Sequence, residues 1–74
     1  MKLPLLKAHV VITAFEKAGF SVLRQKGSHV FMAHPDGRTT VVPNHPTEHL
    51  DRYLLGKILK KDVHMSREEF LSLL

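Results

Sequence analysis

The sequence contains no cysteine and no tryptophan. Without cysteine the chain has neither disulfides nor thiolate metal ligands, so its fold must rest on an apolar core. No apolar run approaches the roughly 18 residues that a membrane-spanning helix needs. The N-terminus is also too short and too soon interrupted by charge for a signal peptide. We therefore expect a cytoplasmic protein with no membrane partner.

Acidic residues are also scarce, because seven Asp and Glu stand against eleven Lys and Arg, which gives a net charge of +4. The carboxylates are scattered and form no cluster of the kind that holds magnesium in metal-dependent nucleases. The sequence has no Walker loop and no GxGxxG fingerprint, so no nucleotide cofactor is expected. A basic surface suits a polyanion such as nucleic acid, although it also serves solubility alone.

A chain of 74 residues favours a single domain over residues 1–74 with a small core. Apolar residues recur at helical spacing near the N-terminus and then alternate at strand spacing. The pattern predicts one helix followed by three strands, over Leu5–Ala18, Phe20–Lys26, His29–His34 and Thr39–Pro43.

Turns and two further helices complete the predicted order. Gly27–Ser28 separates the first two strands, and Pro35–Arg38 is typical of a hairpin turn between the second and third. A second helix is expected over Tyr53–Lys61, after a turn that Thr47 caps. Ser66–Glu69 has the capping-box pattern and opens a third helix. The side chains expected to face inward on this helix are Phe70, Leu73 and Leu74.

This order places the chain in the α+β class. We expect a three-stranded antiparallel sheet in a meander, with the helices packed on one face of it.

His29 is the first candidate for chemistry, because it follows a glycine and a serine where the second strand begins. An imidazole has an ordinary pKa near 6.5 and can act as a general acid or base at neutral pH. Gly27 lets a ligand approach the backbone closely, and Ser28 can bind a phosphate oxygen. The plainer alternative is a strand-end histidine bonded to a nearby carbonyl. The cations expected to contact RNA phosphates are Arg24, Lys26, Arg38 and Lys60.

His45 is a candidate for a second catalytic group. If the hairpin pairs positions that sum to about 73, His29 lies opposite about Asn44, and His45 becomes its neighbour. His45 and His49 also have the spacing of zinc ligands on a helix, but Pro46 interrupts such a helix and no third ligand is evident. We therefore predict no metal site.

The other three histidines belong to no recognisable constellation. We expect His9, His34 and His64 to be solvated at the surface.

Several short pieces in a fixed order run through nearly the whole chain: Phe15–Phe20, Gln25–His29, His34–Arg38, Val41–His45, Lys57–Lys60 and Glu68–Phe70. In this order and spacing they resemble the HicA toxin family, small bacterial and archaeal mRNA interferases. Two departures stand out. Tyr53–Leu54 replace a usual Gly-Thr pair, and Lys61–Met65 is one residue longer than the usual connection.

The resemblance implies a fold similar to double-stranded RNA-binding domains, and the toxin role of a type II toxin–antitoxin system. It implies metal-independent endoribonuclease activity on mRNA, with His29 as the catalytic histidine. It also implies a HicB-like antitoxin that neutralises the toxin by covering the active site.

Three points stay open in the sequence. The second proton transfer belongs to His45, to a lysine such as Lys26, or to the RNA itself. The protein is a ribonuclease, or a non-catalytic RNA-binding module of the same fold. A third hypothesis is a domain whose main role is complex formation.

Overall fold

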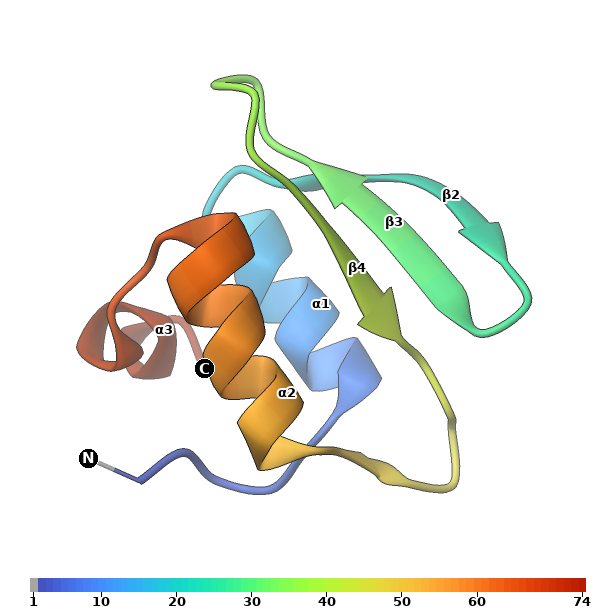
Figure 1. Cartoon of the computed structure of the whole chain (residues 1–74), viewed down its shortest axis with the longest axis vertical. Helices are drawn as coiled ribbons and strands as arrows, with labels where there is room; N and C mark the ends of the chain where they lie inside the picture. The colour runs from blue at the N-terminus through green and yellow to red at the C-terminus, as the bar shows by residue number, and fades with distance from the viewer. Residues whose placement is uncertain (1) are drawn as a thin grey trace.

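A computed structural model describes residues 2–74 and confirms an α+β fold with a three-stranded antiparallel sheet (Figure 1). The main elements are α1 (Ala8–Lys17), β2 (Ser21–Lys26), β3 (His29–Ala33), β4 (Thr39–Pro43), α2 (Arg52–Lys57), the π-helix η1 (Ile58–Val63) and α3 (Arg67–Ser72).

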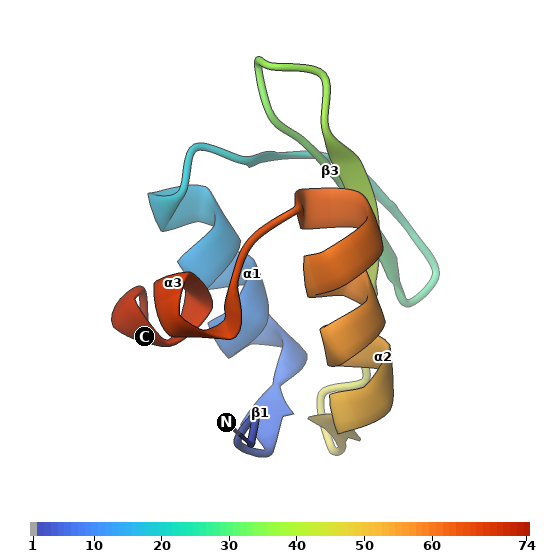
Figure 2. The same cartoon turned by 60° about the vertical axis from the view of Figure 1, so that its left-hand side comes forward.

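The sheet has the order β2-β3-β4, with the predicted meander connections. Figures 1 and 2 show α1 and α2 together on one side of it, while the β3–β4 hairpin projects beyond the helices. The helices cover the sheet face that carries the buried side chains of β3 and β4. We call this the inner face, and the opposite one the outer face. The inner-face side chains of β3 and β4 are Val30, Met32, Thr40 and Val42.

Phe15 lies at the centre of the core and is fully buried on α1. Its ring centroid lies 5.7 Å from that of Phe20 and 5.8 Å from that of Phe70. These separations are typical of favourable aromatic pairs. The three rings therefore join α1, the start of the sheet and α3 in one apolar cluster.

A small second sheet lies at the start of the chain and was not predicted. β1 (Leu6–Lys7) pairs antiparallel with β5 (His49–Leu50). The Nζ atom of Lys7 also donates a hydrogen bond of 3.0 Å to the carbonyl of Pro46. The prediction of a helix from Leu5 was therefore wrong by one turn, because this pairing holds residues 6–7 extended.

The second helix begins at Arg52 and runs longer than predicted. Its N-cap is Asp51, whose carboxylate accepts hydrogen bonds from the amides of Tyr53 and Leu54 at 2.7 and 3.3 Å. This cap was not identified in the sequence. A carboxylate suits this position, because it satisfies amides that have no partner within the helix.

After Lys57 the helix continues as the π-helix η1, whose wider turn takes more residues. This wider turn overlaps Lys61–Met65, the connection that is expected from the sequence to be one residue longer than usual. Val63 nevertheless stays fully buried, and His64 ends the helix in the left-handed conformation with φ of 52°. The wider turn of η1 therefore keeps Val63 in the core.

The capping box at Ser66–Glu69 is confirmed. The Ser66 hydroxyl accepts a hydrogen bond from the Glu69 amide, and the Glu69 carboxylate accepts one from the Ser66 amide. Phe70 is buried as predicted, and Leu73 packs at the edge of the core. Leu74 was wrongly expected inward and is 46% exposed, because α3 ends before it.

None of the helices in the described part of the chain is long and apolar enough to cross a bilayer.

Gly19 ends α1 with φ of 105° and lies against a side chain from the β3–β4 connection. A Cβ atom at this position would lie 2.7 Å from Nε2 of His34, a contact that forces a rearrangement. Gly27 also has a positive φ, 59°, but a Cβ atom there would meet no atom within 4 Å.

We predict that Gly19→Ala lowers the free energy of unfolding by about 2–4 kcal/mol, since strain and steric conflict add. Gly27→Ala is the matched control and should cost about 1 kcal/mol, because it carries only the conformational strain. Urea unfolding of both variants measures the difference. Equal losses of stability would contradict the close contact with His34.

Candidate functional site

His29 and Phe31 lie on the outer face of the sheet because their neighbours in β3 are buried. Val30 and Met32 are 3% and 1% exposed on the inner face, and successive side chains of a strand point to opposite faces. His29 itself is exposed at the start of the strand. The outer face therefore presents an imidazole and an aromatic ring two residues apart.

A β-bulge in β2 brings two cations to the same face. The register shifts between Val22 and Arg24, so that Arg24 pairs with Phe31 and Lys26 pairs with His29. Simple alternation predicts that Arg24 shares a face with Val22. This prediction was wrong, because Leu23 is the extra residue of the bulge and reverses the alternation after it.

The turn between β2 and β3 leaves open space beside His29. Gly27 adopts the left-handed conformation that a tight two-residue hairpin requires. Its carbonyl accepts a hydrogen bond of 3.1 Å from Nε2 of Gln25. Since a Cβ atom at Gly27 would meet nothing within 4 Å, a ligand can approach the backbone at this position.

The chain beyond β4 runs alongside this turn and carries His45. His29 pairs with Pro43, so the expectation of a partner at about Asn44 was one residue out. The amide of Asn44 donates a hydrogen bond of 2.7 Å to the carbonyl of Ser28, which extends the ladder past the strand end. His45 follows directly and is exposed. The structure therefore brings His29 and the segment carrying His45 to the same end of the sheet.

Arg38 lies at the opposite end of the β3–β4 hairpin from His29, and its guanidinium is engaged within the protein. It bonds the Asp36 carboxylate at 2.8 Å, donates to the carbonyl of Val63 at the end of η1, and lies over the ring of Phe20. Hydrogen bonds and charge from Arg38 hold the pKa of Asp36 below its ordinary value. The geometry therefore makes Arg38 a clamp between the hairpin and η1.

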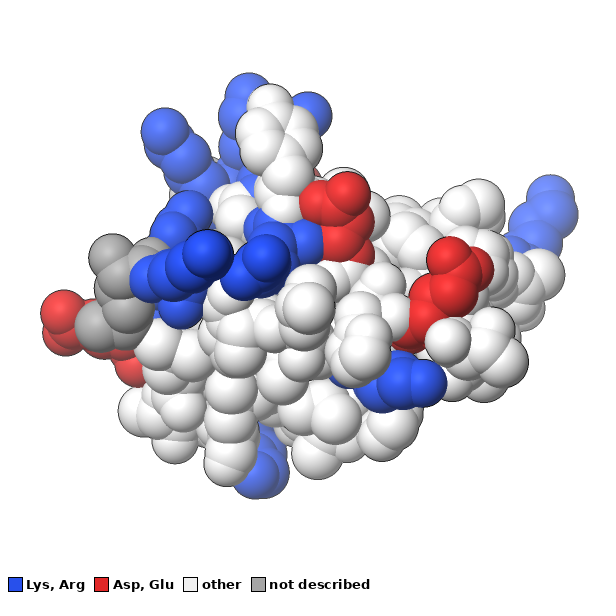
Figure 3. Space-filling model, turned by 90° about the horizontal axis from the view of Figure 1, so that it is seen from below, with Lys and Arg blue, Asp and Glu red and all other residues white. Residues whose placement is uncertain are grey.

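Lys60 lies on η1, on the side of the sheet that faces the helices, and is exposed. It is thus separated from the outward-facing His29. Figure 3 shows Lys and Arg side chains gathered on the end of the molecule where α2 begins. Basic residues therefore occupy a second surface besides the outer face of the sheet.

His34 was expected to be solvated, but it is partly buried and packed in the structure. Its Nε2 lies 3.2 Å from the carbonyl of Ala18, and its Nδ1 accepts a hydrogen bond of 3.1 Å from the Asp36 amide. Its ring also packs against Phe20 with centroids 5.1 Å apart. These contacts show that His34 has a structural role, because it holds the start of the β3–β4 turn against the end of α1 and Phe20.

Carboxylates are absent from the strands of the main sheet. None of the seven Asp and Glu residues of the sequence lies within β2, β3 or β4. Asp62 of η1 lies beside the edge strand and accepts a hydrogen bond of 2.8 Å from the Thr40 hydroxyl. The outer face is therefore suited to a negatively charged ligand.

His45 and His49 line a hollow of about 270 Å³ together with Glu48 and Asp51. Within residues 2–74, however, no group of three or more His, Asp or Glu side chains could hold a metal ion. The zinc-like spacing of the two histidines therefore does not assemble a complete ligand set in this geometry.

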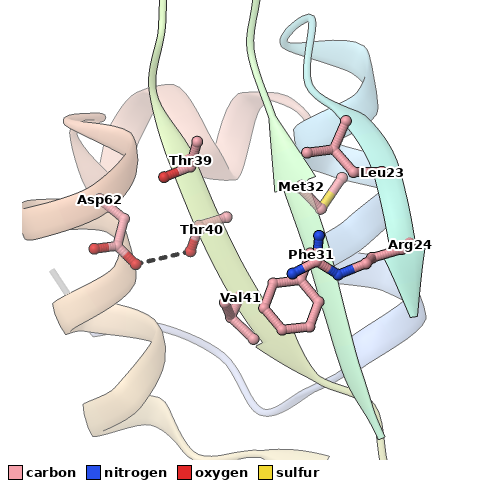
Figure 4. A pocket seen from close by; sticks show the side chains of 8 residues that line it. All are labelled: Leu23, Arg24, Phe31, Met32, Thr39, Thr40, Val41 and Asp62. Carbon is pink, nitrogen blue, oxygen red and sulfur yellow. Dashed lines mark hydrogen bonds between the residues drawn. The ribbon is translucent and has the colours of Figure 1, made fainter. Parts of the chain in front are cut away.

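A groove of about 380 Å³ lies across the strands around Phe31, which is two residues along β3 from His29, and the sequence did not reveal it (Figure 4). The guanidinium carbon of Arg24 lies 4.4 Å from the centroid of the Phe31 ring in this groove. Strand alternation alone shows that Phe31 is opposite in face to Val30. It does not show which of the two faces is buried, so the sequence is equally compatible with a Phe31 that lies in the core.

Residues 9–62 match the family of HicA toxins of bacterial toxin–antitoxin systems. This range runs from α1 into η1 and includes both His29 and His45. The chain belongs to the HicA toxin family. No curated protein matches it.

Membership of the HicA family implies a toxin of a toxin–antitoxin system, with a HicB-type antitoxin as its partner. The matched range contains the whole outer face of the sheet, whereas α3 lies beyond it. The family relationship thus covers the surface on which His29, Lys26 and Arg24 are assembled.

The two arginines near this surface should respond differently to replacement. We predict that Arg38→Met lowers the free energy of unfolding by about 1–3 kcal/mol, since it leaves the Val63 carbonyl without this donor. Arg24→Met should change stability by less than about 1 kcal/mol, because Arg24 is exposed and makes one stacking contact. Thermal and urea unfolding measure both, and a larger loss for Arg24→Met would contradict these assignments.

Proposed function

We propose that this HicA-family chain is an endoribonuclease that cleaves mRNA without a metal cofactor, with His29 as a general acid or base. The observation that carries the proposal is the exposed imidazole of His29, paired across the strands with Lys26 and bordered by an open turn. The proposed setting is the cytoplasm, where mRNA is available. The proposed antitoxin contact is the outer face around His29.

The proposed reaction is cleavage by the 2′-hydroxyl of the RNA. One group removes the proton of this hydroxyl, its oxygen attacks the adjacent phosphorus, and the bond to the 5′-oxygen breaks as a second group supplies a proton. The products are a 2′,3′-cyclic phosphate and a 5′-hydroxyl. His29 performs one of the two proton transfers, and each such transfer typically contributes about 10²–10⁴-fold.

Neighbouring groups would bind the phosphate and stabilise its charge. Paired positions of a sheet place their Cβ atoms about 4.5–5.5 Å apart, so the Lys26 ammonium can reach a phosphate held at His29. The Gly27 backbone and the Ser28 hydroxyl can approach the same phosphate. Arg24 extends the positive charge along the face. Arg38 would support RNA binding indirectly, because it holds the β3–β4 hairpin in place. Lys60 would bind RNA phosphates from the exposed surface of η1.

His29→Ala should lower the rate of RNA cleavage at least about 100-fold, because it removes one proton-transfer group. The measurement is cleavage of a long mRNA by purified protein in the presence of EDTA, with analysis of the fragment ends. Wild-type protein should leave terminal cyclic phosphates. Since His29 is exposed, its replacement should leave thermal unfolding unchanged.

His9→Ala is the matched control, because His9 is an equally exposed histidine on α1, away from the sheet. It should cleave at the wild-type rate. Wild-type rates for His29→Ala would contradict the proposal. Salt-sensitive RNA binding without any cleavage by the wild type would favour the non-catalytic RNA-binding module instead.

The same assay across pH identifies the second group. A general base must be deprotonated and a general acid protonated. Removal of the second group therefore flattens the acid limb of the rate profile if that group is the base, and the alkaline limb if it is the acid. His45→Ala tests His45 in this role. A pH profile of unchanged shape would exclude His45 and leave Lys26 or the RNA itself.

A further inference from the structure

The Phe31–Arg24 pair forms a flat, positively charged surface beside His29. Figure 4 shows the guanidinium of Arg24 next to the Phe31 ring, and its central carbon lies 4.4 Å from the ring centroid. Arg24 is exposed and Phe31 is partly so, although neither is needed to fill the core. The bulge at Leu23 creates this pairing, because an unbulged β2 would direct Arg24 to the inner face.

The groove around this pair is open, and the charged residues that line it are Arg24 and Asp62. Leu23 and Val41 are 62% and 37% exposed, although both are apolar. The hydroxyl of Thr39 adds a polar group, and the carboxylate of Asp62 at the far edge is hydrogen-bonded by Thr40. A phosphate suits the Arg24 side of this groove, whereas a flat neutral group suits the surface between Phe31 and Val41.

We propose that this groove is a stacking subsite for an unpaired nucleobase of single-stranded RNA, with Phe31 and Arg24 as its platform. Aromatic rings and guanidinium planes are the groups on which splayed RNA bases stack. The proposal rests on the proposed function, since it defines how the RNA cleaved at His29 would be held.

The spacing along β3 connects this subsite to the proposed cleavage site. His29 and Phe31 point to the same face two residues apart, which separates them by about 6.6 Å along the strand. A base on Phe31 would therefore belong to a nucleotide adjoining the phosphate at His29 and Lys26. The subsite requires an unpaired base at that position, because a base inside a duplex cannot expose its face.

Charge favours RNA over a protein partner at this groove. Strands β2 and β3 carry Arg24, Lys26 and His29 on the outer face, and no carboxylate lies within β2, β3 or β4. The Asp62 carboxylate, which lines the far edge of the groove, is hydrogen-bonded by Thr40. The stacked guanidinium also gives the apolar surface a positive charge, which complements a base flanked by phosphates.

The test uses a His29→Ala background, so that RNA is bound but not cut. Short single-stranded RNAs are compared with the same RNAs carrying one abasic site at successive positions. We expect one position at which base removal weakens binding about 5- to 100-fold, the effect of one stacked base. In Phe31→Leu this difference should disappear, while the intact RNA binds about as weakly as the abasic one.

Tyr53→Leu is the matched control. Tyr53 of α2 is 77% exposed, and the centroid of its ring lies 5.5 Å from the Nζ atom of Lys57. It therefore offers a second aromatic–cation pair away from the sheet. This variant should retain the discrimination between intact and abasic RNA. Equal effects of Tyr53→Leu and Phe31→Leu would overturn the assignment of the subsite to Phe31.

A second variant gives a direct signal, since the natural chain contains no tryptophan. Phe31→Trp keeps a stacking ring, and its fluorescence should be quenched by intact single-stranded RNA but not by the abasic RNA at the sensitive position. Identical quenching by both RNAs would overturn the proposal. This measurement also applies if Phe31→Leu fails to fold.

The outcomes separate the subsite from the ribonuclease. His29-dependent cleavage with equal affinity for intact and abasic RNA would overturn the subsite alone. Base discrimination through Phe31 without any His29-dependent cleavage would support the subsite and overturn the catalytic proposal. If Phe31→Leu weakens only the binding of a HicB-type antitoxin, the groove is a protein contact and the subsite is wrong.

Discussion

Burial of Val30 and Met32 in the central strand is the constraint on which the site depends. Each contributes about 1.5–3 kcal/mol by leaving water, and a slip of one residue would expose both. Because β3 pairs with both β2 and β4, the alternation of its buried and exposed side chains also sets the register of these two strands. His29 and Phe31 are therefore held on the outer face by the core behind them, and the candidate chemistry needs no buried charge.

The bulge in β2 is the second determinant, since it decides which side chains accompany His29. An extra residue at Leu23 turns Arg24 and Lys26 outward, opposite Phe31 and His29. The edge strand gains a positive outer face in this way. A local irregularity of one residue thus converts a sheet surface into a candidate RNA surface.

Local patterns predicted most of this fold, and long-range contacts account for what they missed. Periodicity located α1 and the three strands, and the capping box located α3, because these signals lie within a few residues. The pairing of Leu6–Lys7 with β5 joins segments over forty residues apart and has no local pattern. Likewise, sequence alone cannot show that the Arg38 guanidinium donates a hydrogen bond to the Val63 carbonyl. An arginine that is bonded within the protein and one that is available to RNA have the same sequence signal.

The central claim is that RNA lies on the outer face of the sheet, and backbone NMR of His29→Ala protein titrated with a short single-stranded RNA tests it most directly. The account predicts that the largest amide shifts fall within residues 24–31 and at Asn44 and His45. It also predicts that these amide shifts become smaller as the salt concentration rises, because salt weakens the binding of RNA. Shifts confined to α2 and η1, with the strands unchanged, would contradict it.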